Sequence, residues 1–352
     1  MNRRDDGPVL IVGGAGFVGC NLAHRLAREG RVVVLYDNLS RPGVERNLAW
    51  LTHTHPAISF QHGDVCDFAS LKNAVTECDL VFHLAAQVAV TTSIVAPRED
   101  FLVNLEGTFN LLEAIRESRR DIGLIFTSTN KVYGALDDIA IDEEATRYVA
   151  SEPGAMHGID ESRPLDFHSP YGCSKGAADQ YVIDYARTYG LRAAVFRMSC
   201  IYGPHQHGTE DQGWVAHFMV QALDDQAIRI YGDGKQVRDI LYVGDLVDAF
   251  LAAESYLDDI AGHAFNIGGG PNNTVSLLEL LDRIAQGGHR PPVAFGNWRQ
   301  GDQRWYVSDP RKFGRATGWY PRVDVEDGLA RLRAWLMENA GPHRAAAGEL
   351  AR

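Results

Sequence analysis

Cysteine is scarce in this sequence of 352 residues. Its five cysteines are odd in number and include no Cys-x-x-Cys pair: Cys20, Cys66, Cys78, Cys173 and Cys200. That pattern argues against a disulfide framework and against a structural zinc site, whose ligands come in closely spaced pairs. His205 and His207 have a His-x-His spacing, but no third ligand stands near them, so we expect loop histidines and no metal.

Long hydrophobic runs are also missing. No apolar stretch reaches the roughly 20 residues that a membrane-spanning helix needs, and the mean hydropathy is −0.20. Residues 1–7 are polar, and the apolar stretch after them leads directly into a glycine turn, unlike a secretory leader. We therefore expect a cytoplasmic protein with reduced thiols and no membrane partner.

Positive charge is in deficit, with 34 Lys and Arg against 46 Asp and Glu and a net charge of −12. Binding to a phosphate backbone needs clustered Lys and Arg, so we expect no nucleic-acid partner. A small phosphorylated ligand needs only a few local donors and stays possible. The hydrophobic content of 45% and charged content of 23% are those of a soluble globular protein.

Strand and helix patterns alternate through the first half of the chain. Alternation of this kind predicts a parallel sheet covered by helices on both faces, a Rossmann-like, doubly wound α/β domain. The apolar runs that predict strands lie at residues 9–12, 32–36, 80–84, 124–127 and 193–198, and the expected helices at 17–29, 104–118 and 171–189.

After about Tyr202 the alternation gives way to short pieces and turn signals. We expect a smaller α/β substrate-binding domain there, made of residues 201–235 and 268–340. The larger domain then covers residues 1–200 and about 236–267, and residues 341–352 form a flexible tail.

A glycine-rich turn follows the first expected strand. Gly13, Gly16 and Gly19 allow a tight turn, close approach of the backbone to a pyrophosphate, and an anion at the helix N-terminus. Phe17 and Val18 lie in the first turn of that helix. A dinucleotide site is the prediction, because a strand precedes the glycines and a helix follows them.

The choice of dinucleotide depends on Asp37, which ends the second strand 18 residues after Gly19. A carboxylate there accepts hydrogen bonds from ribose hydroxyls and repels a 2′-phosphate, so NAD is predicted over NADP. Asn104 either caps its helix or makes a hydrogen bond on the cofactor or active-site side. The other residues expected at the cofactor are Asn38, Asp64, Val65, Leu84, Ala85, Ala86, Gln87 and Met198.

Tyr171 and Lys175 stand four residues apart on one expected helix, so both face the same side. A phenol that titrates near 10 is a poor base at neutral pH. We expect the Lys175 charge and a cationic nicotinamide to lower the pKa of Tyr171 toward the working range. Both residues are therefore predicted to serve catalysis and to contact the cofactor.

Together these features resemble the extended short-chain dehydrogenase/reductases of the nucleotide-sugar epimerase/dehydratase family, from Val9 to about Trp335. In that family a Ser or Thr stands four residues before the Tyr of a Val-Tyr-Gly triplet, which is Tyr133 here. The resemblance implies that Thr129 is the third catalytic residue, orienting the sugar hydroxyl. It also implies a bound NAD that is regenerated in each turnover.

The residues after Thr129 distinguish between subfamilies. The 4,6-dehydratases carry Asp and Glu there to eliminate water, whereas this chain has Asn130 and Lys131, which disfavours dehydration. Residues 128–134, 166–170 and 211–214 resemble the CDP-paratose (CDP-tyvelose) 2-epimerases. The implied reaction inverts the 2-position of a CDP-hexose through a transient keto sugar. Two alternatives stay open, a UDP-sugar 4-epimerase and, from another class, a catalytically silent NAD-sensing regulator, which typically lacks the catalytic Tyr or Lys.

The resemblance also implies a set of substrate contacts. Arg238 and Arg299 match positions that reach the diphosphate, with surface salt bridges as the alternative. Cys200 stands where the family often has Asn, which leaves Ser199 as a substitute, and Trp214 either covers the sugar or base or belongs to the core. The remaining candidates are Gln87, Thr129, Asn130, Lys131, Gln212, Gly213 and Tyr231.

Two further expectations concern assembly and access. The helices at residues 104–118 and 171–189 form dimer contacts in this family, so a homodimer or homotetramer is implied. The acidic insertion at residues 135–168 is a solvated loop or, alternatively, a lid over the sugar site.

Overall fold

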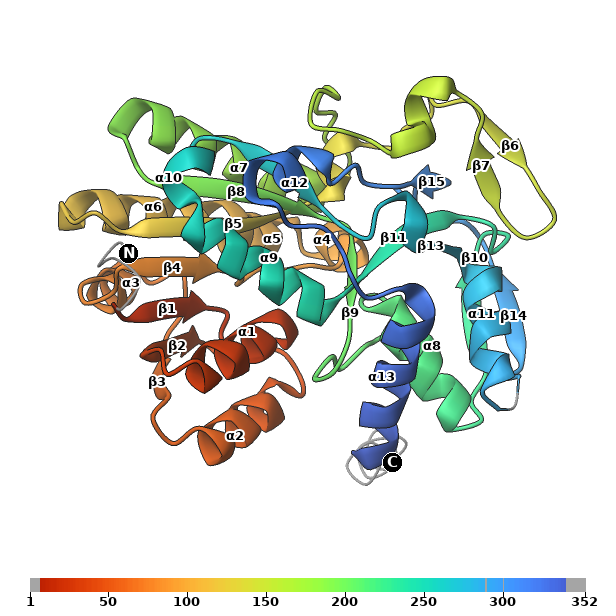
Figure 1. The fold of residues 1–352 in the computed structure, drawn as a ribbon, viewed down its shortest axis with the longest axis horizontal. Helices are drawn as coiled ribbons and strands as arrows, with labels where there is room; N and C mark the ends of the chain where they lie inside the picture. The colour runs from red at the N-terminus through yellow and green to blue at the C-terminus, as the bar shows by residue number, and fades with distance from the viewer. Residues whose placement is uncertain (1–6, 289, 300, 340–352) are drawn as a thin grey trace.

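A seven-stranded parallel sheet forms the centre of the computed structural model, which describes residues 7–288, 290–299 and 301–339 (Figure 1). The strand order is β12-β8-β5-β4-β1-β2-β3. In chain order the strands are β1 (Val9–Val12), β2 (Val33–Asp37), β3 (Ser59–His62), β4 (Leu80–His83), β5 (Gly123–Thr129), β8 (Ala193–Met198) and β12 (Ala264–Ile267). The predicted doubly wound α/β architecture is confirmed, while the predicted tail at residues 341–352 lies outside the described residues.

Each face of this sheet carries its own hydrophobic core, because successive side chains of a strand point to opposite faces. In β1, Val9 and Ile11 enter one core, and Leu10 and Val12 enter the other. The first core takes α1 (Phe17–Arg28), α2 (Val44–Thr54), α9 (Val243–Ser255), α10 (Leu257–Ile260) and α12 (Arg311–Thr317). The second core takes α3 (Phe68–Val75), α6 (Gly107–Ser118) and α7 (Ser169–Tyr189).

The helical segment expected at residues 104–118 begins earlier than the sequence pattern predicts, and α6 (Gly107–Ser118) is its last part. It continues without a break from α5 (Pro97–Phe101) through a π-helical turn, η1 (Leu102–Glu106), and α4 (Val90–Val95) precedes α5. Asn104 lies inside the π-helical turn, so it does not cap a helix. No helix among the described residues is long and apolar enough to cross a membrane.

A smaller sheet lies beyond the carboxyl edge of the large one (Figure 1). Strand β11 (Val237–Tyr242) pairs with β9 (Cys200–Tyr202), β13 (Thr274–Ser276) and β15 (Trp305–Tyr306), and β10 (Ile228–Tyr231) pairs with β14 (Val293–Gly296). A third core joins β9, β10, β11, β13 and β14 to α8 (Trp214–Leu223), α11 (Leu277–Gln286) and α13 (Val325–Glu338), whereas β15 lies in a fourth core. A short 3₁₀ turn, η4 (Pro271–Asn273), precedes β13.

Two segments lie on the other side of the expected domain boundary. Strand β11 was expected in the larger domain, at residues 236–267, yet it pairs only within the smaller sheet. Helix α12 was expected in the smaller domain, yet its Phe313 lies in the first core of the large sheet. The sequence pattern of a short apolar strand or helix is the same in the larger and in the smaller domain. Only its pairing with segments distant in the chain decides to which domain it belongs.

The acidic insertion contains regular structure, while most of its acidic side chains are exposed to solvent as expected. It forms an antiparallel hairpin, β6 (Ile141–Glu143) with β7 (Tyr148–Ala150), followed by a 3₁₀ turn, η3 (Pro153–His157). The Tyr148 N–H donates to the Lys235 carbonyl over 2.9 Å, and the Ile159 N–H donates to the Val307 carbonyl over 2.7 Å. The insertion is thus attached to the smaller sheet, and its action as a lid stays a prediction.

Candidate active site

The predicted cofactor residues meet at the carboxyl edge of the large sheet, where β1 and β4 lie side by side and the order of the strands reverses. Ligands of doubly wound sheets bind at such a switch point. The Ala85 N–H donates to the Val12 carbonyl over 2.9 Å, which brings the loop after β4 against the glycine turn. A Cβ on Gly13 would lie 2.6 Å from the Ala85 nitrogen, so only glycine fits there.

The glycine turn packs closely against the first turn of α1. A Cβ on Gly19 would lie 2.3 Å from the Gly13 carbonyl oxygen, and Gly13 has a φ of +85°, a conformation that favours glycine. Helix α1 begins after Gly16, and no side chain of the described residues caps it. Its first N–H groups, at Phe17 and Val18, are therefore available to an anion such as a pyrophosphate.

Asp37 lies where a ribose contact requires it, at the end of β2 beside the glycine turn. Its Oδ2 accepts the Ala15 N–H over 3.0 Å, and its Oδ1 accepts the Leu39 N–H over 2.9 Å. Next to it, Asn38 Nδ2 donates to Asp64 Oδ2 over 2.8 Å. Val65 is buried against α6 and so contributes to the wall of this region more than to its polar surface.

Gln87 and Asn104 hold the loop after β4 in place. The Gln87 N–H donates to Asn104 Oδ1, and Asn104 Nδ2 donates to the Gln87 carbonyl, both over 2.9 Å. The Gln87 side-chain oxygen is buried and has no hydrogen-bond partner among the described residues. An orphaned acceptor at the switch point, together with a turn that only glycine fits, matches the requirements of a dinucleotide.

The three predicted catalytic residues come together between β5 and α7. Thr129 ends β5, and its hydroxyl, which donates to Asn130 Oδ1 over 3.3 Å, lies close enough to the phenol of Tyr171, buried at the start of α7, to lower the pKa of that phenol. Lys175, one turn later, is 2% exposed and donates from Nζ to the Thr127 carbonyl over 2.6 Å. The ammonium also lies 4.3 Å from the centre of the Phe126 ring.

The expected lowering of the Tyr171 pKa by Lys175 together with a cationic nicotinamide stays a prediction, because Lys175 is not among the groups that shift this pKa in the structure. Burial raises the pKa of Tyr171 to about 12, the Thr129 hydroxyl lowers it, Asp100 raises it and Arg41 lowers it. Burial lowers the pKa of Lys175 to about 7, opposed by the carboxylates of Asp179 and Asp100. Desolvation disfavours the charged form of both groups and outweighs their mutual effect.

Predicted substrate residues gather around the end of β5 and the start of the smaller sheet. Lys131 Nζ donates to the Gly301 carbonyl over 3.1 Å and lies 3.9 Å from Asp302 Oδ1, while Arg238 donates to the same carboxylate oxygen over 2.6 Å. Burial lowers the pKa of Lys131 to about 8; Asp302 raises it, Arg238 lowers it and Cys200 raises it. Lys131 therefore lies in a charged cluster with Arg238 and Asp302.

A second cluster surrounds Arg299. Its guanidinium lies 3.1 Å from Asp211 Oδ1, 3.5 Å from Glu210 Oε1 and 3.9 Å from the centre of the Tyr231 ring. Arg299 is thus paired with carboxylates, as its alternative interpretation expects. Gln212, next to Asp211, has a buried side-chain oxygen without a partner among the described residues.

Trp214 connects the second cluster to Cys200. Gly213, in the left-handed conformation, precedes α8, and Trp214 at the start of this helix donates from Nε1 to Cys200 Sγ over 3.5 Å. Ser199 points away from that contact, because its hydroxyl donates to the buried Asp239. A role for Ser199 as the substitute diphosphate contact would require it to leave Asp239.

Three charged residues near the site escaped the sequence analysis. Arg41 acts electrostatically on Tyr171, and its one signal is its position four residues after Asp37. Asp100 is buried under the catalytic helix, and its signal is a carboxylate four residues before Asn104. Asp302 pairs with Lys131 and Arg238, which no local pattern could indicate.

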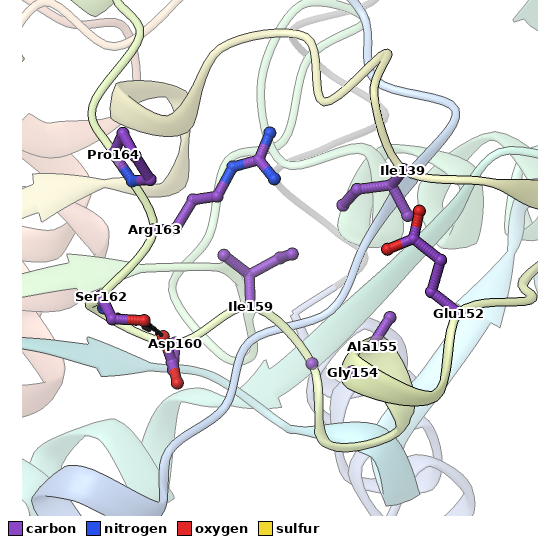
Figure 2. A pocket seen from close by; sticks show the side chains of 10 residues that line it. Ile139, Glu152, Gly154, Ala155, Ile159, Asp160, Ser162, Arg163 and Pro164 are labelled. Carbon is purple, nitrogen blue, oxygen red and sulfur yellow. Dashed lines mark hydrogen bonds between the residues drawn. The ribbon is translucent and has the colours of Figure 1, made fainter.

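A cavity of about 350 Å³ lies apart from these residues, in the insertion (Figure 2). None of the predicted site residues lines it. Its polar groups are paired with neighbours, Ser162 with Asp160 and Arg163 with Asp138. Its lining consists of Ile139, Glu152, Gly154, Ala155, Gly158, Ile159, Asp160, Ser162, Arg163 and Pro164.

Comparison with known proteins agrees with this geometry. The NAD dependent epimerase/dehydratase family matches residues 9–268. CDP-paratose 2-epimerase of Salmonella typhi is 44% identical over 93% of this chain and 98% of its own length. A putative UDP-glucose 4-epimerase of Methanocaldococcus jannaschii is 31% identical over 94% of this chain and 99% of its own.

Solved structures give the same result. UDP-glucose 4-epimerase of Thermus thermophilus, solved as a complex with NAD, superposes with a TM-score of 0.78 and 30% identity, covering 94% of this chain and 99% of its own. The expected family and the expected cofactor are both confirmed, as is the expectation of an enzyme. This chain belongs to the NAD-dependent epimerase/dehydratase family, and its cofactor is NAD.

Proposed function

We propose that this protein is a 2-epimerase of a CDP-linked hexose. The observation that carries the proposal is the arrangement after Thr129, where Asn130 and Lys131 replace the acid and base that eliminate water, and Lys131 lies beside Arg238 at the sugar side. The 44% identity to a CDP-paratose 2-epimerase, against 31% for a putative UDP-glucose 4-epimerase, supports the same assignment.

Tyr171 is the proposed proton acceptor. Bound NAD supplies the hydride acceptor and, in the second half-reaction, the donor. The Thr129 hydroxyl lies near enough to the Tyr171 phenol to lower its pKa, so one sugar hydroxyl can contact both oxygens while its proton passes to the phenolate. Tyr171 then returns the proton after the keto sugar has turned its opposite face toward the nicotinamide.

Lys175 and the charged cluster have complementary roles. The Lys175 ammonium, held on the Thr127 carbonyl, is placed to contact the nicotinamide ribose and to favour the phenolate. Lys131 and Arg238 supply positive charge for the diphosphate, and a fixed diphosphate lets the sugar rotate about its phosphate linkage. The seven-stranded sheet is accordingly the NAD-binding part and the smaller sheet with α8, α11 and α13 the sugar-nucleotide part.

The proposal also covers the oligomeric state and the cellular role of the protein. Aromatic side chains on α6 and α7 are exposed, with Phe109 at 39%, Tyr181 at 43% and Tyr189 at 53%. Contiguous exposed aromatic surface of this kind indicates a protein contact, so we propose a homodimer or a homotetramer built on it. Light scattering of the wild type and of Tyr181→Glu tests this contact between subunits. We also propose a cytoplasmic role in carbohydrate biosynthesis.

Incubation with CDP-paratose in deuterated buffer tests the reaction. We expect proton NMR of the product to show an inverted 2-position coupling and no carbon-bound deuterium, because the same hydrogen returns to the same carbon. UDP-glucose serves as the comparison substrate, and inversion of its 4-position without turnover of CDP-paratose would replace the proposal by a 4-epimerase. Deuterium at the reacting carbon would reject direct hydride return.

A further inference from the structure

A buried carboxylate lies beneath the catalytic helix and has no role in the mechanism above. Asp100, on α5, is 1% exposed, and it forms no ion pair with any described residue. A charge in such a place costs free energy unless several donors satisfy it. The structure must therefore supply hydrogen-bond donors to Asp100, and these donors show which elements it connects.

The donors belong to the two elements that face the cofactor and the sugar. Asp100 Oδ2 accepts the hydroxyl of Ser174, which stands between Tyr171 and Lys175 on α7. Asp100 Oδ1 accepts Asn104 Nδ2 over 3.0 Å. One carboxylate thus holds the catalytic helix and the π-helical turn together.

Asn104 extends this connection to the cofactor loop. Its amide exchanges two hydrogen bonds of 2.9 Å with the backbone of Gln87, and it also lies 3.2 Å from the Ser174 hydroxyl. Asp100, Asn104 and Ser174 therefore connect the catalytic helix to the loop after β4.

The charge of Asp100 acts on both catalytic groups. Burial raises the pKa of Tyr171 to about 12, and Asp100 raises it further, whereas Thr129 and Arg41 lower it. Burial lowers the pKa of Lys175 to about 7, and both Asp179 and Asp100 oppose that change. Asp179 is already neutralised by two hydrogen bonds from Arg197, and burial keeps the pKa of His83 at about 3, so His83 is neutral.

We propose that Asp100 is a positioning residue, which fixes the distance between the catalytic helix and the cofactor loop and whose negative charge sets the pH range in which Tyr171 and Lys175 work. The inference rests on the proposed function only for its activity assay. The effect of Asp100 on the ionisation of Tyr171 involves only groups of this chain and can be measured without turnover.

Asp100→Asn is the main test, because it keeps the shape and removes the charge. Loss of that charge lets Tyr171 ionise more readily and Lys175 lose its proton more readily. We expect both limbs of the pH profile of kcat to move down by about one pH unit, with kcat lower by about tenfold and KM changed little. The appearance of phenolate absorbance with rising pH, taken as the difference from the Tyr171→Phe background, should move in the same direction.

Three variants separate this role from simple loss of structure. Asp245→Asn removes an equally buried carboxylate, 4% exposed and bound by the Arg322 and Val323 N–H groups, and should leave the pH profile in place. Asp100→Glu restores the charge and should restore the pH range. Ser174→Ala keeps the charge and removes one contact, so kcat should fall about fivefold with the pH range unchanged.

The outcomes are distinct from failure of the proposed function. A parent enzyme inactive on CDP-paratose, with a phenolate signal that still moves in Asp100→Asn, rejects the substrate and supports Asp100. An active parent whose pH profile and phenolate signal stay fixed in Asp100→Asn overturns the inference. If Asp100→Asn does not fold, wild-type kcat in Ser174→Ala overturns it instead.

Discussion

The cofactor side and the substrate side of this site consist of different kinds of chemical groups. At the cofactor side, backbone groups and small residues at the ends of parallel strands make the surface, and Asp37 is the main charge. At the substrate side, long charged side chains from strand β11 and from loops of the smaller domain make it, with Arg238 paired to Asp302 and Arg299 to Asp211.

The difference shows how each ligand is accommodated. A backbone cradle is preorganised and tolerates no added atoms, so it suits a cofactor that stays bound. The cationic side chains opposite it already have carboxylate partners. If these side chains hold the diphosphate as proposed, the diphosphate must replace those partners when it binds. The protein's own acids then lower the affinity for the substrate and favour release of the product.

The catalytic pair, which lies between the two sides, gives the largest expected effect. Tyr171→Phe should lower kcat by about 10³-fold or more, because the proton acceptor is lost, while NAD remains bound. Turnover of CDP-paratose measures kcat, and the NAD released on denaturation measures the bound cofactor. Tyr181→Phe, on an exposed part of the same helix, is the control. Near-normal activity in Tyr171→Phe would mean that another group is the base.

Gly19→Ala tests the backbone cradle. The new Cβ would lie 2.3 Å from the Gly13 carbonyl oxygen, so α1 must shift. We expect NAD affinity to fall about 100-fold and the free energy of unfolding to fall by about 1–3 kcal/mol. Gly154→Ala is the matched control, since a Cβ there meets nothing within 4 Å. Equal NAD content in both variants would contradict a rigid cradle.

Arg238→Gln tests the opposite side. It removes a charged donor for the diphosphate, and we expect KM for the CDP-sugar to rise about 10- to 100-fold while bound NAD is unchanged. Arg229→Gln, on the exposed face of β10, provides the control. An unchanged KM would assign Arg238 to the salt bridge with Asp302 alone.

Asp302→Asn should have a smaller effect of the opposite sign. Without the carboxylate, Lys131 and Arg238 lose an internal competitor, and CDP should bind about three- to tenfold more tightly. Calorimetric titration with CDP measures this. Weaker binding would show that Asp302 orients the two cations and does not compete with the ligand.

The last prediction concerns stability and its dependence on pH. Because burial lowers the pKa of Lys175 to about 7, the unfolded chain binds more protons than the folded chain between about pH 7 and the ordinary lysine value. The wild type should therefore gain stability as the pH rises through that range. Lys175→Met should melt higher than the wild type at pH 6, with a difference that shrinks toward pH 10. Lys72→Met, at an exposed lysine, should show no such pH dependence.

Sequence reasoning predicted the place of a residue correctly where that place depends on its neighbours in the chain. Gly13, Gly19 and Asp37 follow strands that the apolar pattern predicts, and Tyr171 with Lys175 shares one helix face. It failed where the partner is distant in sequence. The pairing of β11 with the smaller sheet depends on strands far along the chain, and so does the ion pair of Arg238 with Asp302.

Burial was the other quantity that the sequence could not supply. The expected effect of Lys175 on Tyr171 treats both as partly solvated groups, whereas both are nearly inaccessible to water. In that environment desolvation exceeds the effect of one neighbouring charge, and its size depends on the packing of the whole site.

The π-helical turn between α5 and α6 has a consequence for the length of the chain. Such a turn contains one more residue than an α-helical turn, and one residue in an α-helix corresponds to a rotation of about 100°. Deleting one residue from Leu102–Glu106 would keep Leu111 and Ile115 of α6 in their core and rotate Asp100 on α5 away from Ser174. The helical phase of this segment, and not only its composition, is therefore tied to the active site, so homologous enzymes that share the chemistry should tolerate substitutions here better than insertions or deletions.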